Sequence, residues 1–232
     1  MHKSLLSASL LAFALAAPFA QAFEAGDIIL RAGAITVNPD ADSSSVKVDQ
    51  GPLAGADLGG KATLSSDTQL GLNFAYMITN NLAIELLAAT PFEHDVKLKN
   101  TALGVVNGKL GTIKQLPPTL SLVYYPLDHK SDFQPYVGAG INYTWVYDEH
   151  VGSEASAKGF DNFRADSSWG LAWQVGADYM LTDHIMINGQ VRYIDIDTTG
   201  YVNNDALAAG TRAKVDIDVD PWVYMVGLGY KF

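Results

Sequence analysis

Hydrophobic and polar residues alternate strictly along the last stretch of the chain, from Trp222 to Phe232. One face carries the large apolar and aromatic side chains: Trp222, Tyr224, Val226, Leu228, Tyr230 and Phe232. The other face carries small residues and a lysine: Val223, Met225, Gly227, Gly229 and Lys231. This period predicts a β-strand with two different surroundings. Glycines and a lysine suit the crowded interior of a small barrel, so we interpret the aromatic face as turned towards lipid.

The same alternation predicts eight strands in all. They cover roughly residues 27–37, 68–79, 82–92, 113–126, 134–147, 167–181, 184–197 and 216–232. Most are as long as tilted membrane-spanning strands need to be, and no stretch of similar length has a helical period. We therefore predict an all-β fold, an eight-stranded antiparallel transmembrane β-barrel.

The connections between these strands alternate between long and short. Long connections cover 38–67, 93–112, 148–166 and 198–215, whereas the short ones are Asn80–Asn81, 127–133 and Thr182–Asp183. This arrangement puts both termini at the end with the short turns. It is typical of an outer-membrane barrel, which has short periplasmic turns and long extracellular loops.

The first residues have the pattern of an export signal. A positive start at Lys3 precedes an apolar stretch from Leu5 to Phe19, and Ala20-Gln-Ala22 matches a cleavage site. We predict residues 1–22 as a cleaved signal peptide and 23–232 as one barrel domain of 210 residues (232 − 22). The chain has no cysteine, and removing Lys3 would lower its net charge from −10 to −11. We expect it in the bacterial outer membrane, with both termini in the periplasm.

Five charged residues fall on the predicted inward face: Arg31, Glu85, Asp178, Arg192 and Lys231. Because unpaired buried charge is costly, we expect them to form an internal network. Apolar residues share that face, among them Ile35, Leu87, Ala89 and Val223. An eight-stranded barrel has room inside for side chains or one small ligand, so a plugged barrel and a narrow, partly apolar channel both stay open.

Prolines cluster on two neighbouring predicted strands. Pro91 lies late in one, and Pro117 and Pro118 lie early in the next, roughly opposite it. Proline cannot donate to a strand ladder, so the cluster should weaken this seam. We hypothesise a lateral opening towards lipid here, with Leu87 and Ala89 on the path. The alternative is that the barrel wall simply ends at these prolines.

Several motifs together resemble the OmpW family of outer-membrane proteins, closest to its OprG-like members, with AlkL-type proteins more distant. They are Thr68–Leu72, Glu85–Phe92, Leu116–Leu120, Tyr136–Thr144, Ser168–Gly170, Asp195–Asp197 and Asp220–Val223. The resemblance implies a narrow, largely apolar channel for small hydrophobic molecules or small amino acids, with lateral release into the membrane. Pro91 matches the proline of the family's third strand.

The sequence departs from the family at one interior position. Where the family often has Val-Trp-Tyr-Met, this chain has Val191-Arg-Tyr-Ile194. An inward Arg192 would place a charge where the family has an apolar wall residue, which favours a polar or anionic substrate.

Three other functions compete with transport. A plugged structural or adhesive barrel fits the acidic long loops, such as 148–166. An enzyme would need a nucleophile or histidine held against an acid or base, but His94, His129, His150 and His184 lie in or beside predicted turns and loops without such partners. A soluble lipocalin-like barrel conflicts with the outward aromatic residues. We predict no enzyme activity, no cofactor and no metal site, since Glu93-His94-Asp95 is an incomplete ligand set.

We expect the partners to be those of a membrane barrel. They are outer-membrane lipid and lipopolysaccharide, small hydrophobic or amino-acid solutes, and the barrel-assembly machinery, which would read the aromatic residues of the C-terminal strand (Trp222, Tyr224, Tyr230 and Phe232). A net charge of −10 argues against nucleic acid. We expect a monomer.

Overall fold

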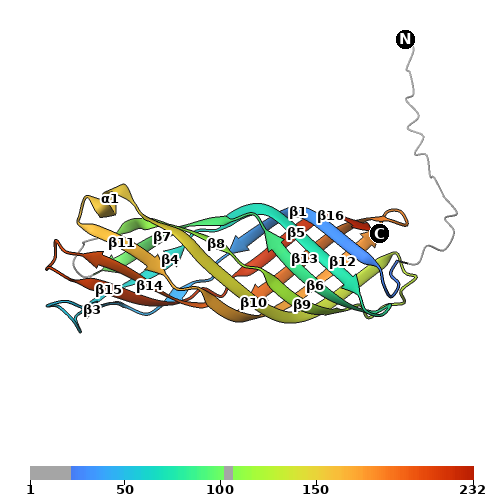
Figure 1. Cartoon of the computed structure of the whole chain (residues 1–232), viewed down its shortest axis with the longest axis horizontal. Helices are drawn as coiled ribbons and strands as arrows, with labels where there is room; N and C mark the ends of the chain where they lie inside the picture. The colour runs from blue at the N-terminus through green and yellow to red at the C-terminus, as the bar shows by residue number, and fades with distance from the viewer. Residues whose placement is uncertain (1–21, 102–106) are drawn as a thin grey trace, which may run out of the picture.

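The computed structural model describes residues 22–101 and 107–232, which form sixteen β-strands and one short helix. The strands make a long tube, and both ends of the described chain lie at the same end of it (Figure 1). Among the described residues, no helix is long and apolar enough to cross a membrane. The predicted signal peptide lies almost wholly outside the described residues, so its cleavage stays a prediction.

Eight strands close the half of the tube that carries the termini, which we call the periplasmic half. Each pairs antiparallel with the next, and the first pairs with the last. In ladder order they are β1 (Ile28–Asn38), β5 (Asp67–Met77), β6 (Leu82–Ala89), β9 (Thr119–Tyr124), β10 (Phe133–Val151), β12 (Ser168–Met180), β13 (Ile185–Ile194) and β16 (Trp222–Lys231). This confirms the predicted eight-stranded antiparallel barrel.

The outer surface of the periplasmic half is apolar. Large side chains that alternate along its strands are about half exposed, including Leu70 and Phe74 on β5, Ile141 on β10, Trp173 on β12 and Leu228 on β16. Small residues let the strands and interior side chains approach closely. A side-chain carbon at Gly176, for example, would lie 2.4 Å from the ring of Tyr136 inside the barrel.

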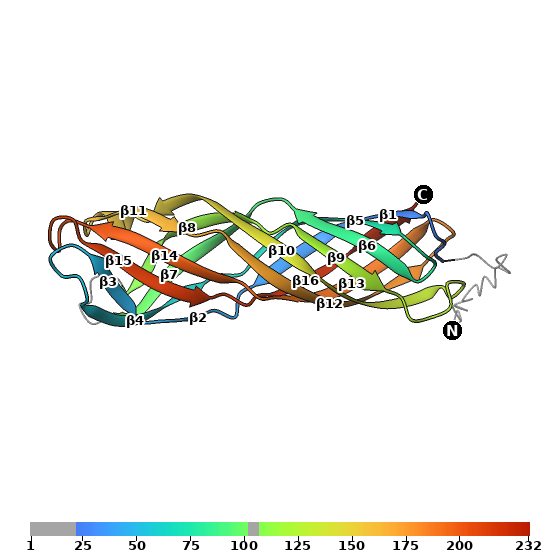
Figure 2. The same ribbon diagram turned by 60° about the horizontal axis from the view of Figure 1, so that its bottom comes forward.

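The opposite half, which we call the extracellular half, corrects one prediction. The segments predicted as long loops are mostly strands, and they extend the tube (Figure 2). In ladder order the strands are β11 (Phe160–Ala165), β14 (Asp197–Asn204), β15 (Arg212–Asp218), β3 (Val46–Gln50), β4 (Asp57–Leu64), β7 (Phe92–Thr101), β8 (Gly108–Leu116) and the second half of β10. The short β2 (Asp42–Ser43) pairs with β15, and the helix α1 (Ser153–Ser156) lies between β10 and β11.

The two halves have opposite polarity. In the extracellular half most buried positions are apolar and most outward ones are polar, as in Val46-Lys47-Val48-Asp49. In the periplasmic half the outward positions are apolar, and much of the middle of the interior is polar. These long segments were not predicted as strands because their hydrophobic face points into the tube. The membrane strands were recognised by a hydrophobic face that points outward.

Candidate functional site

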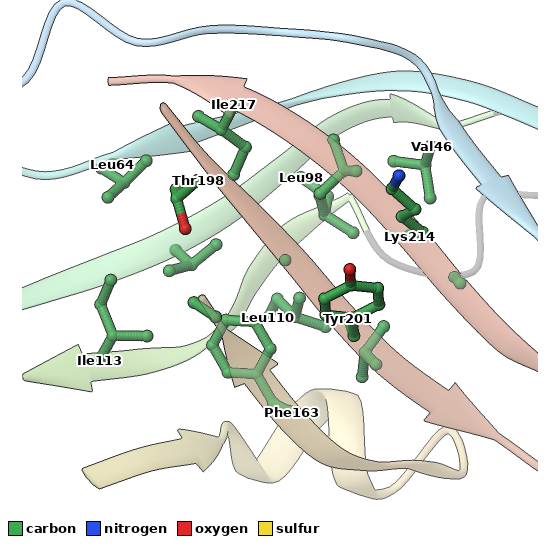
Figure 3. A pocket seen from close by; sticks show the side chains of 16 residues that line it. Val46, Leu64, Leu98, Leu110, Ile113, Phe163, Thr198, Tyr201, Lys214 and Ile217 are labelled. Atoms are coloured by element: carbon green, nitrogen blue, oxygen red, sulfur yellow. The ribbon is translucent and has the colours of Figure 1, made fainter. Parts of the chain in front are cut away.

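The interior of the extracellular half is a continuous apolar cluster, which we call the apolar column. It includes Val96 and Leu98 from β7, Ile113 from β8 and Phe163 from β11, and it reaches down to Leu87 on β6. Within it lies a cavity of about 30 Å³ lined mainly by aliphatic and aromatic residues (Figure 3). A cavity of this size holds about one water molecule, so a solute can pass only if side chains move.

Below the apolar column the barrel is crossed by buried charges. Arg31 is 0 % exposed and donates from Nε to Asp178 Oδ1 at 2.9 Å and from Nη2 to Asp178 Oδ2 at 2.6 Å. Its Nη1 reaches Asn73 Oδ1 at 3.0 Å and Glu85 Oε2 at 3.5 Å, and its Nη2 also donates to the Tyr125 hydroxyl at 2.9 Å. A two-point guanidinium–carboxylate pair with these extra bonds is the geometry that offsets burial of charge.

Arg192 joins the same network from β13. Its Nη2 donates to Glu85 Oε1 at 2.8 Å and its Nε to Gln174 Oε1 at 3.1 Å, and the Gln174 amide donates to Glu85 at 2.9 Å. Arg31, Glu85, Asp178 and Arg192 form a neutral set of two acids and two bases, which we call the charge layer. Arg192 is 1 % exposed, and its Nη1 has no hydrogen-bond partner.

The fifth predicted interior charge lies apart from this network. The Lys231 ammonium faces Asp27 at 3.9 Å near the periplasmic end, where its side chain is mostly buried. A second apolar cluster closes that end, with Phe23 edge-on to Tyr125 at 5.0 Å and Tyr125 against Tyr136 at 5.3 Å. The charge layer is therefore covered on the periplasmic side as well.

The wall beside the top of the charge layer is interrupted at the proline cluster. β6 and β9 pair as far as Leu87 and Thr119, and β7 and β8 resume at Phe92 and Gln115. Across residues 22–101 and 107–232, no residue pairing or backbone hydrogen bond joins the two stretches between these points, Ala88–Pro91 and Leu116–Pro118. We call this interval the seam; it contains Pro91, Pro117 and Pro118.

Each side of the seam is bonded away from the other. On one side, the Thr90 amide donates to the Leu70 carbonyl of β5 at 2.9 Å. On the other, Asn142 of β10 donates from Nδ2 to the carbonyls of Pro117 and Pro118 at 3.1 and 3.2 Å. The seam is thus a discontinuity between two well-bonded walls. Leu87 and Phe92 are buried at its two ends, and Ala89 is partly buried beside the apolar column.

The sequence placed His94 in or beside a loop, and this prediction was wrong. His94 is fully buried in β7, just beyond the seam. Its Nδ1 lies 2.6 Å from the Ser65 carbonyl and its Nε2 lies 2.8 Å from the Gln115 amide nitrogen. An amide nitrogen can only donate, so Nε2 accepts and Nδ1 carries the proton, and the ring is neutral. Burial lowers the pKa of His94, which is consistent with this assignment.

The remaining predicted residues fall into two groups. Trp222, Tyr224 and Tyr230 of β16, and Phe232 directly after it, are 42–66 % exposed on the outer surface. Glu93, His94 and Asp95 do not converge, because His94 is inward and Asp95 pairs with Lys109 on the outer surface. The charge layer is also hydrogen-bonded to Asn73, Gln174 and Tyr125, which were not predicted as site residues. Asn73 and Gln174 could have been predicted, because the strand alternation places both on the inward face.

The closed apolar-faced barrel defines the class, a β-barrel protein of the bacterial outer membrane. Residues 24–232 match the OmpW family. The chain is 42% identical over 212 residues to outer membrane protein W of Vibrio cholerae, covering 91% of each chain. It is 51% identical to the crystal structure of OprG from Pseudomonas aeruginosa, with a TM-score of 0.84 and coverage of 91% of this chain and 98% of that one. A more distant relative, 27% identical over 176 residues and covering 75% of this chain and 76% of its own, is the dibenzothiophene metabolism operon protein PahQ of P. aeruginosa.

The chain belongs to the OmpW family, as the motifs predicted, and is an outer-membrane protein.

Proposed function

We propose that this protein takes up small hydrophobic molecules, or small amino acids, from the outer medium and releases them sideways into the membrane. The observation that carries the proposal is the position of the seam relative to the charge layer. Glu85 and Leu87 are successive inward residues of β6, a tilted strand, so the charge layer lies about 5 Å below the residue at which the seam begins. An apolar solute that descends the apolar column meets charge below it and an unpaired wall beside it.

The charge layer makes passage into the periplasm unfavourable. To go straight through, a solute would have to separate Arg31 from Asp178 and Arg192 from Glu85, which are fully buried pairs. Removing one partner of a buried pair typically costs 3–5 kcal/mol. Moving Leu87 or Phe92 aside at the seam needs only side-chain rotation into a region where no ladder must be broken. The sideways route is therefore the less costly one.

The name of one relative supports the apolar substrate class. One relative is named for a dibenzothiophene metabolism operon, and dibenzothiophene is an apolar aromatic compound. Arg192 does not conflict with an apolar path, because it is bonded into the charge layer and the residues above it on the inward face belong to the apolar column.

A plugged structural barrel is the second candidate, and the cavity of about 30 Å³ favours it. The channel and the plugged barrel are distinguished by an uptake measurement. Entry of a small apolar solute and of a small neutral amino acid is measured in liposomes that contain the refolded protein, with empty liposomes as the control. Faster entry of either solute supports a channel. No increase, with the barrel shown to be folded, supports the plug.

The sideways route is tested by closing the seam covalently. The chain has no cysteine, so the pair Ala88→Cys/Leu116→Cys can be joined by a cleavable bifunctional maleimide without background reaction. Joining should abolish the added uptake, and cleaving the linker should restore it. The matched control is Leu72→Cys/Ala88→Cys, because these residues are ladder partners in a continuous part of the wall.

Proline replacement gives a second test of the seam. Pro91→Ala restores a backbone donor and should reduce uptake without unfolding the barrel, whereas Pro126→Ala in a periplasmic turn should leave uptake unchanged. Uptake that survives both the covalent linker and Pro91→Ala would show that the solute leaves by another route.

A further inference from the structure

A row of cationic and aromatic side chains crosses the outer surface of the extracellular half. Arg164 of β11 is the ladder partner of Tyr201 of β14, Tyr201 is the partner of Lys214 of β15, and Lys214 is the partner of Lys47 of β3. We call these four residues the cationic row. Their neighbours in sequence, such as Val202 and Val215, are buried inside the tube, so the row points outward.

The row is unfavourable for stability by itself. Like charges directly opposite each other in a ladder destabilise it, and Lys47 and Lys214 are such a pair. Lys214 is compensated by Asp216 at 3.1 Å, and the neighbouring Arg212 by Asp49. Within the described part of the chain, Lys47 and Arg164 have no carboxylate in ion-pair distance. Two cations at the ends of the row are thus available to an external anion.

A polar hollow lies against the same row. Its volume is about 460 Å³, within the usual range of small-molecule sites. Arg164, Arg212 and Tyr201 line it together with the side-chain amides of Gln50, Asn162 and Asn203. The Arg212 guanidinium stacks 5.0 Å from the centre of the Tyr201 ring, which holds both groups in place.

The hollow also contains one acid, Asp166, which narrows the class of ligand. A simple anion such as inorganic phosphate would be repelled by this carboxylate. A sugar carries hydroxyl groups that donate to a carboxylate and to amide oxygens, and a phosphate on that sugar would accept from arginine and lysine. The mixed lining therefore fits a phosphorylated saccharide better than a bare anion or a neutral sugar.

The height of the hollow above the membrane fits the headgroup of an outer-leaflet lipid. Trp169 is 70 % exposed and belongs to the aromatic residues that mark the outer edge of the membrane-facing surface. Arg164, on β11, precedes Trp169, on β12, by five residues, and this largely extended stretch of chain places the hollow roughly 10–15 Å further out. A saccharide joined to a membrane lipid would reach this level.

We propose that the cationic row and the polar hollow bind the phosphorylated saccharide headgroup of lipopolysaccharide. One phosphate is bound by Arg164 beside Tyr201 in the hollow, a second phosphate of the same headgroup is bound by Lys47 at the other end of the row, and sugar hydroxyl groups bond to Asp166 and the amides. Tyr201 and Lys214 also border the cavity of the apolar column, but the cations that would bind the phosphates, Arg164 and Lys47, do not, so this binding does not depend on the proposed transport.

The test measures binding by the full-length refolded protein in detergent. Three probes are compared: intact lipopolysaccharide with a phosphorylated core, the same material after dephosphorylation, and the lipid-free phosphorylated oligosaccharide. Arg164→Gln and Lys47→Gln remove the two available cations, and each should weaken binding of intact lipopolysaccharide about three- to tenfold. Lys130→Gln is the matched control, since Lys130 is an exposed lysine of a periplasmic turn outside the row.

The outcomes separate the possibilities. Weaker binding in both row variants, with Lys130→Gln unchanged and a loss on dephosphorylation, supports the site. If the lipid-free oligosaccharide shows the same variant dependence, the headgroup alone is recognised; if only the intact material does, the lipid is needed to present it. Equal affinities in all three variants, or tight binding of the dephosphorylated material, would overturn the proposal. Heat-dependent gel mobility shows in each case that the variant is folded.

Discussion

The two halves of the tube use the same strand period with opposite orientation. In the periplasmic half Leu72 and Phe74 face outward and Asn73 is buried, whereas in the extracellular half Val46 and Val48 are buried and Lys47 faces outward. Lipid surrounds the first half and water the second, and in each case the face that matches the surroundings is exposed. The comparison shows that one continuous tube can pass from lipid into water along its axis if its apolar residues change from the outward to the inward face.

The change of orientation leaves the interior with a boundary. Apolar residues fill the extracellular half, but the interior of the periplasmic half contains the charge layer, because the small and polar face of each membrane strand must point inward. The boundary coincides with the seam. The function proposed above follows from this coincidence, and the predictions below test the difference between the halves.

The largest effect is expected from breaking the charge layer. Arg31→Leu leaves Asp178 without its charged partner inside the barrel and removes one of the two arginines that contact Glu85. The free energy of unfolding, measured by urea titration in lipid bilayers with tryptophan fluorescence, should fall by about 3–5 kcal/mol. Lys61→Leu breaks the exposed pair with Asp42 and is the control; it should leave the midpoint unchanged. Similar midpoints for the two variants would mean that Arg31 is not structurally required.

The next effect follows from the opposite surroundings of the two outer faces. Val226 faces lipid from the middle of β16, and Val226→Lys should lower the free energy of unfolding by about 2–4 kcal/mol. Thr112 of β8 faces outward in the extracellular half with Asp95 as a ladder partner, and Thr112→Lys should change the free energy of unfolding by less than about 0.5 kcal/mol. The same urea titration serves both. A large loss in Thr112→Lys would place the membrane boundary further out than the aromatic residues indicate.

The sequence allowed the lipid-facing strands to be predicted but not the extracellular ones. Leu70, Leu72 and Phe74 identify β5 because membrane strands are recognised by an apolar outward face. The strands β3, β7 and β15 have the same period, but their polar face carries lysines and aspartates, and such segments read as solvated loops. The inward charges were predictable from parity alone; their partners were not, because Arg31 meets Asp178 across 147 residues of sequence.

The position of His94 shows the same limit. A histidine between two acids in a segment expected to be a loop indicated a solvated side chain, whereas the strand turns it inward between Ser65 and Gln115. The seam was predictable in outline because proline's missing donor is a local property of the residue. How the two sides are held depends on contacts from β5 and β10, and these require the fold.

A smaller effect is expected from His94 through pH. Burial lowers the pKa of His94 in the folded protein, so the folded state binds fewer protons than the unfolded state in the range where histidine titrates. Its contribution is therefore fully present above the unfolded value of about 6.5 and is lost as pH falls towards the folded value. Thermal midpoints measured from pH 7.5 to 5 should fall more steeply in the native protein than in His94→Gln. Parallel curves would mean that the pKa of His94 is the same in the folded and unfolded states.

The smallest effect concerns the outer face where the halves meet. Asp197 and Asp218 are ladder partners, and the carboxylates of Asp195, Asp197 and Asp220 lie within 4.8 Å of one another. Partial burial, and then the neighbouring acids, raise the pKa of Asp197. The ionised carboxylate therefore destabilises the fold at neutral pH, and this destabilisation is lost when Asp197 takes up a proton as the pH falls. Asp197→Asn should therefore stabilise the protein at pH 7 by at most about 1 kcal/mol, and the gain should disappear at pH 4. The measurement is the urea midpoint at both pH values. Asp161→Asn, at an exposed position on β11, is the control; an equal gain there would assign the effect to net charge rather than to the paired aspartates.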